Sequence, residues 1–547
     1  MAGFDHDRVR ELGVVAAGSS QSVAAGSEVL RAGGNAADAL VAALFATAAG
    51  DPSITSLAGG AVAIFRNANG SVEVGDFFSN APGLESPAHG ENRSNAQRSP
   101  APNNDFREVD FREVQIDFGA GESSQSFHVG RGSAAIPGAI PGLIAALERW
   151  GTLSLSDVVS PTVRMLRTGF QISAYQASCL EVLGPILLLT SKGRRYFQRG
   201  DGKLLQENDR FSNPELAETL ETLGQDPDYY EHSIVPTIVE EFGFSVGGQI
   251  TSEDQAQWKP RFRNALTASY GGVLVHTNPA PAQGGRFVLL TLELCESIGL
   301  RHIPRDSPER QRLLACVLRA ISEVRAQTPE LVDRTDAVAL ARRRVEAILD
   351  GDDSFPAEPS GPANTTHVSV VDRQGNAAGA TLSHGEGCGH WIGKTGLHMN
   401  NLLGEEDLFP AGFHNFVPGA RLTTMMAPTV LVHRHHGVSV LGSGGANRIR
   451  SAISQAILAL VDDQLAVEYA VARNRIHFED GVLSAEIYGE PGDQTVYEQA
   501  ARISKEVRFF ERPSLFFGGV HVAQRDSSGQ LHGVGDPRRG GCAEIVT

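Results

Sequence analysis

The stretch Asn364-Thr-Thr-His-Val-Ser-Val-Val-Asp372 decides the fold of this chain. Residues 351–363, immediately before it, are rich in Gly, Pro, Asp and Ser, a composition typical of a linker. A β-branched run is followed by a turn signal at 372–376 and by a second strand-like run at 377–383. This pattern predicts a β-hairpin centred near Gln374.

The register of that hairpin brings two hydroxyl groups together. With the turn centred near Gln374, Val371 faces Ala377. In the same register Thr365 faces Ser383, and directly opposed residues have Cβ atoms about 4.5–5.5 Å apart. A slip of one residue would move Ser383 to the other face of the sheet, so the interpretation depends on the register.

A threonine at the start of this strand is a candidate nucleophile. Cleavage between Asn364 and Thr365 would give Thr365 a free α-amine, whose reference pKa of about 7.7–8.0 suits a general base at neutral pH. One residue would then supply both nucleophile and base, and Ser383 would hold the Thr365 hydroxyl in place. The alternative from this segment alone is an ordinary edge strand after a linker.

The glycine-rich segment Gly442-Ser-Gly-Gly-Ala-Asn447 joins a predicted strand to a predicted helix. Consecutive glycines let backbone N–H groups converge, and a helix N-terminus adds partial positive charge. This arrangement suits an oxyanion hole for a tetrahedral intermediate. A phosphate loop would need a following Gly-Lys-Ser/Thr, which is absent, and a plain tight turn remains the alternative.

Composition excludes several classes of protein. The chain has 547 residues, 41% hydrophobic and 20% charged, with a formal net charge of −17. An acidic chain without a basic stripe argues against binding to nucleic acid or to an anionic membrane surface. The five cysteines are widely spaced, so neither a disulfide framework nor a metal site is expected from them.

Other sequence features predict a cytoplasmic protein without a cofactor. The N-terminus has no basic segment leading into an apolar one, and the longest apolar run, 39–49, is too short to span a bilayer. The run His433-Arg-His-His436 could bind a metal, but a solvated turn between strands is the preferred interpretation. No metal or other cofactor is therefore predicted.

The rest of the chain has a recognisable order of elements. Two helices are expected, at 21–34 and from Asn35 to Ala49, followed by a strand at 59–65. Residues 86–104 have the composition of an exposed polar insertion. Helical patterns dominate 140–345, with one strand expected at 270–276 and a rigid loop at 279–285. Beyond the linker, strands are expected at 377–383, 428–433 and 438–443, and a helix at 446–461.

Several motifs in one order resemble the γ-glutamyltransferase family over nearly the whole chain. Besides the segments at 365–372 and 442–445, these motifs are Val29-Leu-Arg-Ala-Gly-Gly-Asn-Ala-Ala-Asp38, Ser133-Ala-Ala-Ile-Pro-Gly138, Pro279–Gly285, Met399-Asn-Asn401 and Arg421-Leu-Thr-Thr-Met-Met-Ala-Pro428. The resemblance implies an α+β fold, the αββα sandwich of N-terminal-nucleophile hydrolases. It also implies a precursor that cuts itself into a large subunit, residues 1–364, and a small catalytic subunit, residues 365–547.

The resemblance also implies roles for individual residues. Thr365 matches the family nucleophile, Ser383 a second hydroxyl, and Gly444 and Gly445 the glycines of the oxyanion hole. In the substrate site, Thr423 and Thr424 match a Ser-Ser pair that holds the α-carboxylate. Glu405 falls at or near an acidic position that binds the α-amine.

The sequence departs from the family pattern inside the substrate site. In Asp76-Phe-Phe-Ser-Asn-Ala-Pro82, Phe78 takes the position of the carboxylate-binding arginine. Gly385 and Leu402 replace a family Asn and Gln, and the segment from Glu405 to Arg421 is short, so a substrate-covering lid is expected to be missing. Arg131 is the candidate replacement for the arginine, with a surface ion pair as its alternative role.

Three functions follow as hypotheses. The first is a γ-glutamyl hydrolase or transferase acting on glutathione or similar amides, with water or an amino acid as acceptor. The second is an amidase or acylase of the same fold with a different acyl group. The third is a catalytically inactive scaffold that binds small molecules. For the two enzymes, the expected partners are the small-molecule substrate, the acceptor and the two subunits of one precursor.

Overall fold

The structure is a computed structural model, and it describes residues 11–84, 109–117, 124–327, 334–352, 354–355, 365–409, 412–434, 437–488 and 500–547. The polar insertion predicted at 86–104, most of the linker at 351–363 (residues 353 and 356–363), and Asn364 lie outside these residues. So do His435 and His436.

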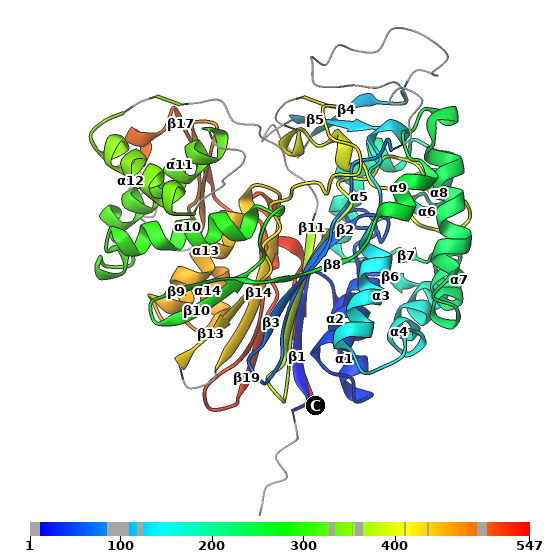
Figure 1. The fold of residues 1–547 in the computed structure, drawn as a ribbon, viewed down its shortest axis with the longest axis horizontal. Helices are drawn as coiled ribbons and strands as arrows, with labels where there is room; N and C mark the ends of the chain where they lie inside the picture. The colour runs from blue at the N-terminus through cyan, green and yellow to red at the C-terminus, as the bar shows by residue number, and fades with distance from the viewer. Residues whose placement is uncertain are drawn as a thin grey trace, which may run out of the picture.

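Two β-sheets lie face to face between two layers of helices (Figure 1). The order in the first sheet is β20-β1-β11-β12-β2-β3-β8, and the order in the second is β19-β18-β14-β13-β10-β9. Strands β11 and β12 contact β14 across the interface between the sheets. Helices α1, α2 and α3 cover the outer face of the first sheet, and α10 and α13 cover that of the second. The predicted αββα sandwich is confirmed.

The first sheet is built from seven described strands: β1 Gly13–Ala17, β2 Gly60–Arg66, β3 Val72–Phe77, β8 Arg261–Asn264, β11 Thr365–Asp372, β12 Ala377–Ser383 and β20 Cys542–Val546. The second contains β9 Leu266–Tyr270, β10 Val273–Thr277, β13 Thr429–Val432, β14 Val438–Gly444, β18 Gly519–Arg525 and β19 Leu531–Val534. Smaller sheets pair β4 Arg112–Asp117 with β5 Ser124–Val129, β6 Phe170–Gln171 with β7 Arg210–Phe211, and β15 Ile476–Glu479 with β16 Val482–Glu486 and β17 Glu506–Phe510.

The helices fall into two groups on opposite sides of the sheets (Figure 1). One group comprises α1 Ser20–Arg31, α2 Ala36–Gly50, α3 Ala139–Trp150, α4 Leu155–Thr168, α5 Ala174–Leu187, α6 Ser191–Phe197, α7 Pro214–Gln225, α8 Val235–Phe242 and α9 Ser252–Gln257. The other comprises α10 Gly284–Ser297, α11 Pro308–Gln327, α12 Arg334–Leu349, α13 Arg448–Val461 and α14 Val467–Ala472. In the part of the chain that the structure describes, no helix is both long and apolar enough to cross a membrane.

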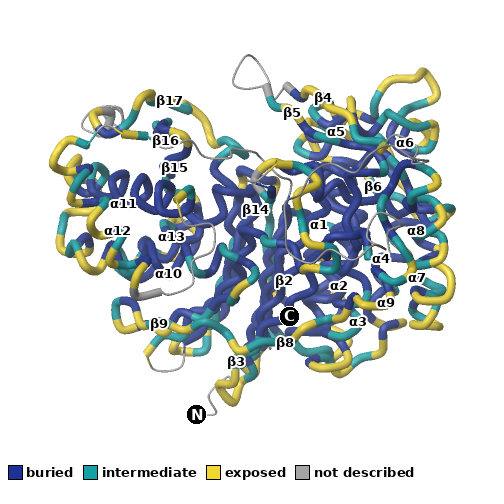
Figure 2. Tube along the Cα trace, turned by 45° about the horizontal axis from the view of Figure 1, so that its top comes forward, coloured by how far each residue is buried: buried dark blue, intermediate teal, exposed yellow. Residues whose placement is uncertain are grey.

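Three apolar layers hold the sandwich together, and Figure 2 shows the sheets and their inner helices as the buried part of the molecule. Strand β1 shows how a strand serves two of these layers, because Val15 packs toward the helices and Val14 toward the second sheet. Strands buried on both faces are mostly apolar instead of alternating, as β1 and β2 are. Strand β11 is also buried throughout, but it carries polar residues such as Thr365 and His367.

The β11–β12 hairpin has the predicted register. Thr365 pairs with Ser383 and Val371 pairs with Ala377. Asp372 fixes this register, because its Oδ1 accepts hydrogen bonds from the N–H groups of Gln374 and Asn376, each at 3.0 Å. Its Oδ2 accepts from the N–H of Ala36 at 3.1 Å, which ties the turn to the first residue of α2.

Several predicted boundaries are corrected by the structure. The single strand expected at 270–276 is two strands, β9 and β10, joined by a turn at Gly271 and Gly272, both with positive φ. The loop expected at 279–285 ends earlier, since Gly284 already begins α10. The helix expected at 21–34 ends at Arg31, and Asn35 caps α2 through a capping box with Asp38.

Candidate active site

Thr365 is the first residue of β11, and its side chain is buried. On one side β11 pairs with β12 along its length, but on the other side the pairing with β1 stops at Val368. Thr365 therefore stands beyond the last pair of the β1 ladder, opposite Ser383. The Ser383 hydroxyl accepts a hydrogen bond from the Gly385 N–H at 3.0 Å, which orients it at the end of β12. The bond to Asn364, the predicted cleavage point, lies outside the described residues.

The glycine segment at 442–445 packs directly against Thr365. Strand β14 ends at Gly444, and a Cβ at that position would lie 1.9 Å from the carbonyl oxygen of Thr365, so only glycine fits. Gly445 has a φ of +114°, a conformation that L side chains rarely adopt. The structure thus brings both predicted oxyanion-hole glycines beside the predicted nucleophile, at the turn that leads into α13.

The two sheets approach closely where the ring of His367 in β11 packs against Gly442 in β14. The His367 ring is completely buried, with Nδ1 2.9 Å from the Thr381 hydroxyl and Nε2 2.9 Å from the Ser369 hydroxyl. A Cβ on Gly442 would lie 2.3 Å from that ring. Burial holds the pKa of His367 well below its usual range, so the neutral ring is a packing and orienting group.

A cavity opens beside Thr365 and Ser383. It encloses about 300 Å³, including its opening to solvent. Most of the side chains that line it are apolar, and the described lining residues include no Lys or Arg. The lining residues are Phe78, Thr365, Ser383, Leu402, Glu405, Leu408, Thr424, Met425, Met426, Ala446 and Ile449.

Glu405 is the one acidic side chain among these lining residues. It lies between two short 3₁₀ helices, η5 Leu402–Gly404 and η6 Glu406–Leu408. A Cβ added to Gly385 would lie 2.5 Å from Glu405 Oε1 and 2.1 Å from Asn401 Oδ1. Glycine at position 385, where the family has Asn, therefore leaves room for the side chains of Glu405 and Asn401.

The two predicted carboxylate-binding threonines are placed differently. Thr424 lines the cavity, and its hydroxyl accepts from the Met426 N–H at 3.3 Å. Thr423 is half-buried and is not among the residues that line the cavity. The structure therefore brings Thr424 to Thr365 and leaves Thr423 outside this set.

Arg421 contacts the main chain of Phe78 but is not among the residues that line the cavity. Its guanidinium donates to the carbonyl of Phe78 and, at 2.6 Å, to the carbonyl of Lys259, and lies 3.4 Å from Asp76. Burial lowers the pKa of Arg421 to about 10, while the Asp76 charge opposes that shift. These contacts make Arg421 a structural cation that supports the segment carrying Phe78.

Arg131, predicted as a replacement carboxylate clamp, is engaged elsewhere. It begins the short helix η1 Arg131–Ser133, and its Nε donates to the Glu241 carbonyl at 2.9 Å. Its guanidinium also lies 3.8 Å from the carboxylate of Asp110. It does not line the cavity beside Thr365, so this arrangement gives the clamp role no support.

Arg539 is a neighbour of Thr365 that sequence reasoning did not identify. It belongs to η10 Pro537–Arg539 near the C-terminus, and its Nη1 lies 3.5 Å from the Thr365 carbonyl oxygen. It stands 174 residues after Thr365 in the chain and belongs to none of the motifs singled out above. No local pattern could have joined the two residues.

Cys388 and His433 take ordinary structural roles. The Cys388 thiol is buried, and burial raises its pKa to about 12, so it is not a reactive thiolate at neutral pH. His433 Nε2 lies 3.0 Å from the Ser439 hydroxyl at the β13–β14 turn. Within the described ranges, no group of three or more His, Cys, Asp or Glu side chains could hold a metal ion.

The four-layer sandwich, with a threonine at the first residue of a central strand, defines the class of N-terminal-nucleophile hydrolases. The Gamma-glutamyltranspeptidase family model matches residues 22–546. The chain therefore belongs to the γ-glutamyltranspeptidase family.

Relatives of two kinds resemble this chain. The Acylase ACY 1 proenzyme of Pseudomonas sp. (strain SE83) is 29% identical over 491 residues, which cover 87% of this chain and 84% of the acylase. The Glutathione hydrolase proenzyme of Escherichia coli (strain K12) is 26% identical over 557 residues, covering 96% and 90%. The crystal structure of a cephalosporin acylase from Bacillus halodurans shares the fold, with a TM-score of 0.77 and 18% identity over 100% of this chain and 98% of that one.

Proposed function

We propose that this protein is a self-processing amide hydrolase and acyltransferase, and that Thr365 is its nucleophile. In processing, the Thr365 hydroxyl attacks the carbonyl carbon of Asn364, the peptide C–N bond breaks, and water hydrolyses the resulting ester. The products are residues 1–364, ending in a carboxylate, and residues 365–547, beginning with a free α-amine. The position of Thr365 at the cavity, opposite Ser383, supports this proposal.

Turnover then follows the same chemistry on an external amide. The Thr365 Oγ attacks the substrate carbonyl while the α-amine accepts the hydroxyl proton. The amide C–N bond breaks, the leaving amine takes up that proton, and an acyl ester on Thr365 remains. Water or an acceptor amine attacks the ester and releases the acyl group. Backbone N–H groups at Gly444 and Gly445 stabilise the oxyanion in both halves of the reaction.

The composition of the cavity bears on which acyl group is used. Phe78 stands where the resemblance implies a carboxylate-binding arginine, and the described lining residues supply no cation. Burial of an uncharged polar group without a hydrogen-bond partner costs roughly 2–7 kcal/mol, and burial of an unpaired carboxylate costs more. We therefore propose an acyl group with an apolar chain and without an α-carboxylate, and we propose that Glu405, the acidic lining residue, binds an ammonium group on that chain.

A second candidate keeps the γ-glutamyl group. Glu405 and Thr424 both line the cavity, and they match positions that in the family bind the α-amine and the α-carboxylate. In this case the Thr424 hydroxyl would have to stabilise the carboxylate without help from a charged group.

A panel of p-nitroanilides separates these candidates. We expect processed enzyme to release p-nitroaniline from hexanoyl and 6-aminohexanoyl anilides at least about ten-fold faster than from the γ-glutamyl anilide, since one charge-assisted pair is worth about 1.5–3 kcal/mol. A γ-glutamyl anilide that exceeds both would establish the second candidate. A purified chain that remains uncut at 58.2 kDa and hydrolyses none of them would favour the inactive scaffold.

A further inference from the structure

Arg539 places a buried positive charge beside Thr365. Its Nη1 lies 3.5 Å from the Thr365 carbonyl oxygen, and its Nη2 donates to the Leu515 carbonyl at 3.2 Å. The same guanidinium lies behind the oxyanion glycines, because a Cβ on Gly444 or Gly445 would be 3.4 or 3.3 Å from its terminal nitrogens. Arg539 itself is only 6% exposed. One cation therefore borders both the predicted nucleophile and the turn that would bind the oxyanion.

The turn that carries Arg539 is firmly anchored. Asp536 accepts hydrogen bonds from the Arg538 N–H at 3.0 Å and from the Val520 N–H of β18 at 2.9 Å. The stem of Arg539 covers Gly519, where an added Cβ would lie 2.7 Å from the Arg539 Cδ. The guanidinium is thus held in place by the end of the second sheet.

Its charge is opposed by few neighbours. Asp51, which follows α2, is buried, and in the described part of the chain its Oδ2 has no hydrogen-bond partner. Burial raises the pKa of Asp51 to about 7, and Arg539 acts against that rise. Asp51 is therefore mostly protonated below pH 7 and cancels little of the Arg539 charge in that range.

Asp536, on the same turn, is ionised but is paired with Arg475 and Arg538. Four further titratable groups near Arg539 are neutral at neutral pH. Burial raises the pKa of Cys179 to about 12 and of Cys542 to about 11, lowers the pKa of His521 to about 4, and holds the pKa of Tyr175 well above its usual range. Glu405 lines the same cavity as Thr365.

We infer that Arg539 is a positioning residue that fixes the Thr365 main chain and keeps its freed α-amine uncharged. The inference rests on the proposed function, in which that amine is the general base. Within Thr365, only three bonds separate the α-nitrogen from the carbonyl oxygen that Arg539 contacts. A nearby positive charge disfavours protonation of an amine, so Arg539 lowers the pKa of the Thr365 α-amine and extends its basic form to lower pH.

The test compares Arg539→Met and Arg539→Lys with the parent enzyme after processing. For each protein, kcat/KM is measured from pH 5 to 9 with the p-nitroanilide that the parent hydrolyses fastest. Arg539→Met should move the acid limb upward by about 0.5–2 pH units, the range given by one charge at this separation in an intermediate dielectric. At alkaline pH, kcat/KM of Arg539→Met should stay within a few-fold of the parent value. Arg539→Lys keeps the charge, so its acid limb should lie close to that of the parent.

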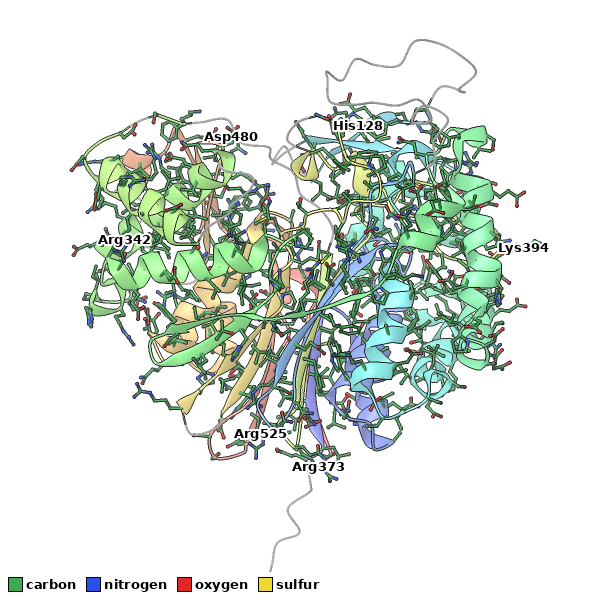
Figure 3. The ribbon with its side chains drawn as sticks, viewed as in Figure 1. His128, Arg342, Arg373, Lys394, Asp480 and Arg525 are labelled. Carbon is green, nitrogen blue, oxygen red and sulfur yellow. The ribbon has the colours of Figure 1, made fainter. Side chains whose placement is uncertain are left out.

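Arg525→Met is the matched control. Arg525 lies at the lower end of the sheets in Figure 3, and the cavity lies toward the upper end. His128 marks that upper end, and its carbonyl accepts a hydrogen bond from Asn401 beside the cavity. This variant should leave the pH profile unchanged, because a charge so far from Thr365 is screened by solvent.

A second readout does not depend on any substrate. The rate at which acetic anhydride acetylates the Thr365 α-amine, followed by mass spectrometry of the N-terminal peptide, reports the pKa of that amine directly. The same upward shift is expected in Arg539→Met. Processed, active variants whose acid limb and acetylation profile match the parent would overturn the inference. A parent chain that is neither cut nor active would instead overturn the proposed function.

Discussion

Thr365 lies directly opposite Ser383 in the β11–β12 ladder, and both residues line one cavity. This pairing follows from the turn, because Asp372 accepts two backbone hydrogen bonds there and prevents a slip of register. A slip of one residue would turn every side chain of β12 to the other face. The local chemistry of a four-residue turn thus decides which hydroxyl stands beside the predicted nucleophile.

Replacing the predicted nucleophile should abolish self-processing. Thr365→Ala should remain one chain of 58.2 kDa, whereas Thr365→Ser should still be cut because it keeps a hydroxyl. The parent should give a small fragment of 547 − 364 = 183 residues. Gel electrophoresis shows the fragments, and N-terminal sequencing distinguishes cleavage before Thr365 from cleavage before Thr366. Efficient cleavage of Thr365→Ala in a protease-free preparation would exclude self-processing by this hydroxyl.

Ser383 offers a milder test of the same geometry. Ser383→Ala should lower kcat by about 5- to 10-fold, because one hydrogen bond is worth roughly 1 kcal/mol. Ser383→Thr keeps the hydroxyl and should retain most of the activity. Steady-state kinetics on the processed proteins measures both effects. Equal losses in the two variants would mean that packing, and not the hydroxyl, is what matters at this position.

The hairpin and its neighbours were predictable because their signals are local. Asn35 caps α2 as expected, and strand β12 begins and ends at the expected residues, since capping and turn chemistry act over a few positions. The strand expected at 270–276 failed because Gly271 and Gly272 form a turn inside an apolar run. The hydrophobic periodicity alone does not reveal such a turn.

The site itself was only partly predictable. Among the residues that the motifs singled out, Thr365, Ser383, Glu405 and Thr424 line one cavity, and Gly444 packs against Thr365. Motif order could not reveal Arg539, because that residue lies 174 positions after Thr365, in the short helix η10 between β19 and β20. The replacement clamp expected at Arg131 was inferred from proximity in sequence to a family motif, and the partners of that side chain lie elsewhere.

Phe78 should control which acyl group enters the cavity. Phe78→Arg would add a guanidinium that can bind a carboxylate through two hydrogen bonds. It should raise kcat/KM for the γ-glutamyl anilide by about 10-fold or more relative to the hexanoyl anilide. Phe78→Leu, which removes the ring without adding charge, is the control and should leave the γ-glutamyl anilide a poor substrate. Self-cleavage of each variant verifies folding, and an unchanged ratio in a cleaved Phe78→Arg enzyme would contradict this role.

Glu405 should recognise an amino group on the acyl chain. Glu405→Gln removes the negative charge and should lower kcat/KM for the 6-aminohexanoyl anilide by about 10- to 150-fold, the value of one charge-assisted pair. The hexanoyl anilide, which has no ammonium group, should be affected much less. Glu406→Gln changes the exposed neighbour in the same way and should alter neither substrate. Equal losses for both anilides in Glu405→Gln would show that Glu405 supports the cavity and does not recognise the ammonium group.

Asp51 should make the stability of the fold depend on pH. Burial raises the pKa of its carboxyl to about 7, above the value of about 3.9 expected in the unfolded chain. The folded state therefore binds the Asp51 proton more tightly, so this contribution to stability is complete below about pH 4 and is lost as pH rises through about 7. A difference of about three pKa units corresponds to roughly 4 kcal/mol as an upper figure.

Asp51→Asn tests this prediction because it keeps the shape of the side chain and cannot ionise. Urea unfolding is best measured in the uncut Thr365→Ala background, where the two halves cannot separate. Between pH 5 and 8 the parent should lose the Asp51 contribution to its stability, and the variant should not. The free energy of unfolding of the variant, minus that of the parent, should therefore rise across that range. Asp228→Asn, at an exposed position, should show no such trend. A parallel pH dependence in the Asp51→Asn and parent proteins would mean that the Asp51 carboxyl is ionised throughout, and that Arg539 is paired instead of carrying an uncancelled charge.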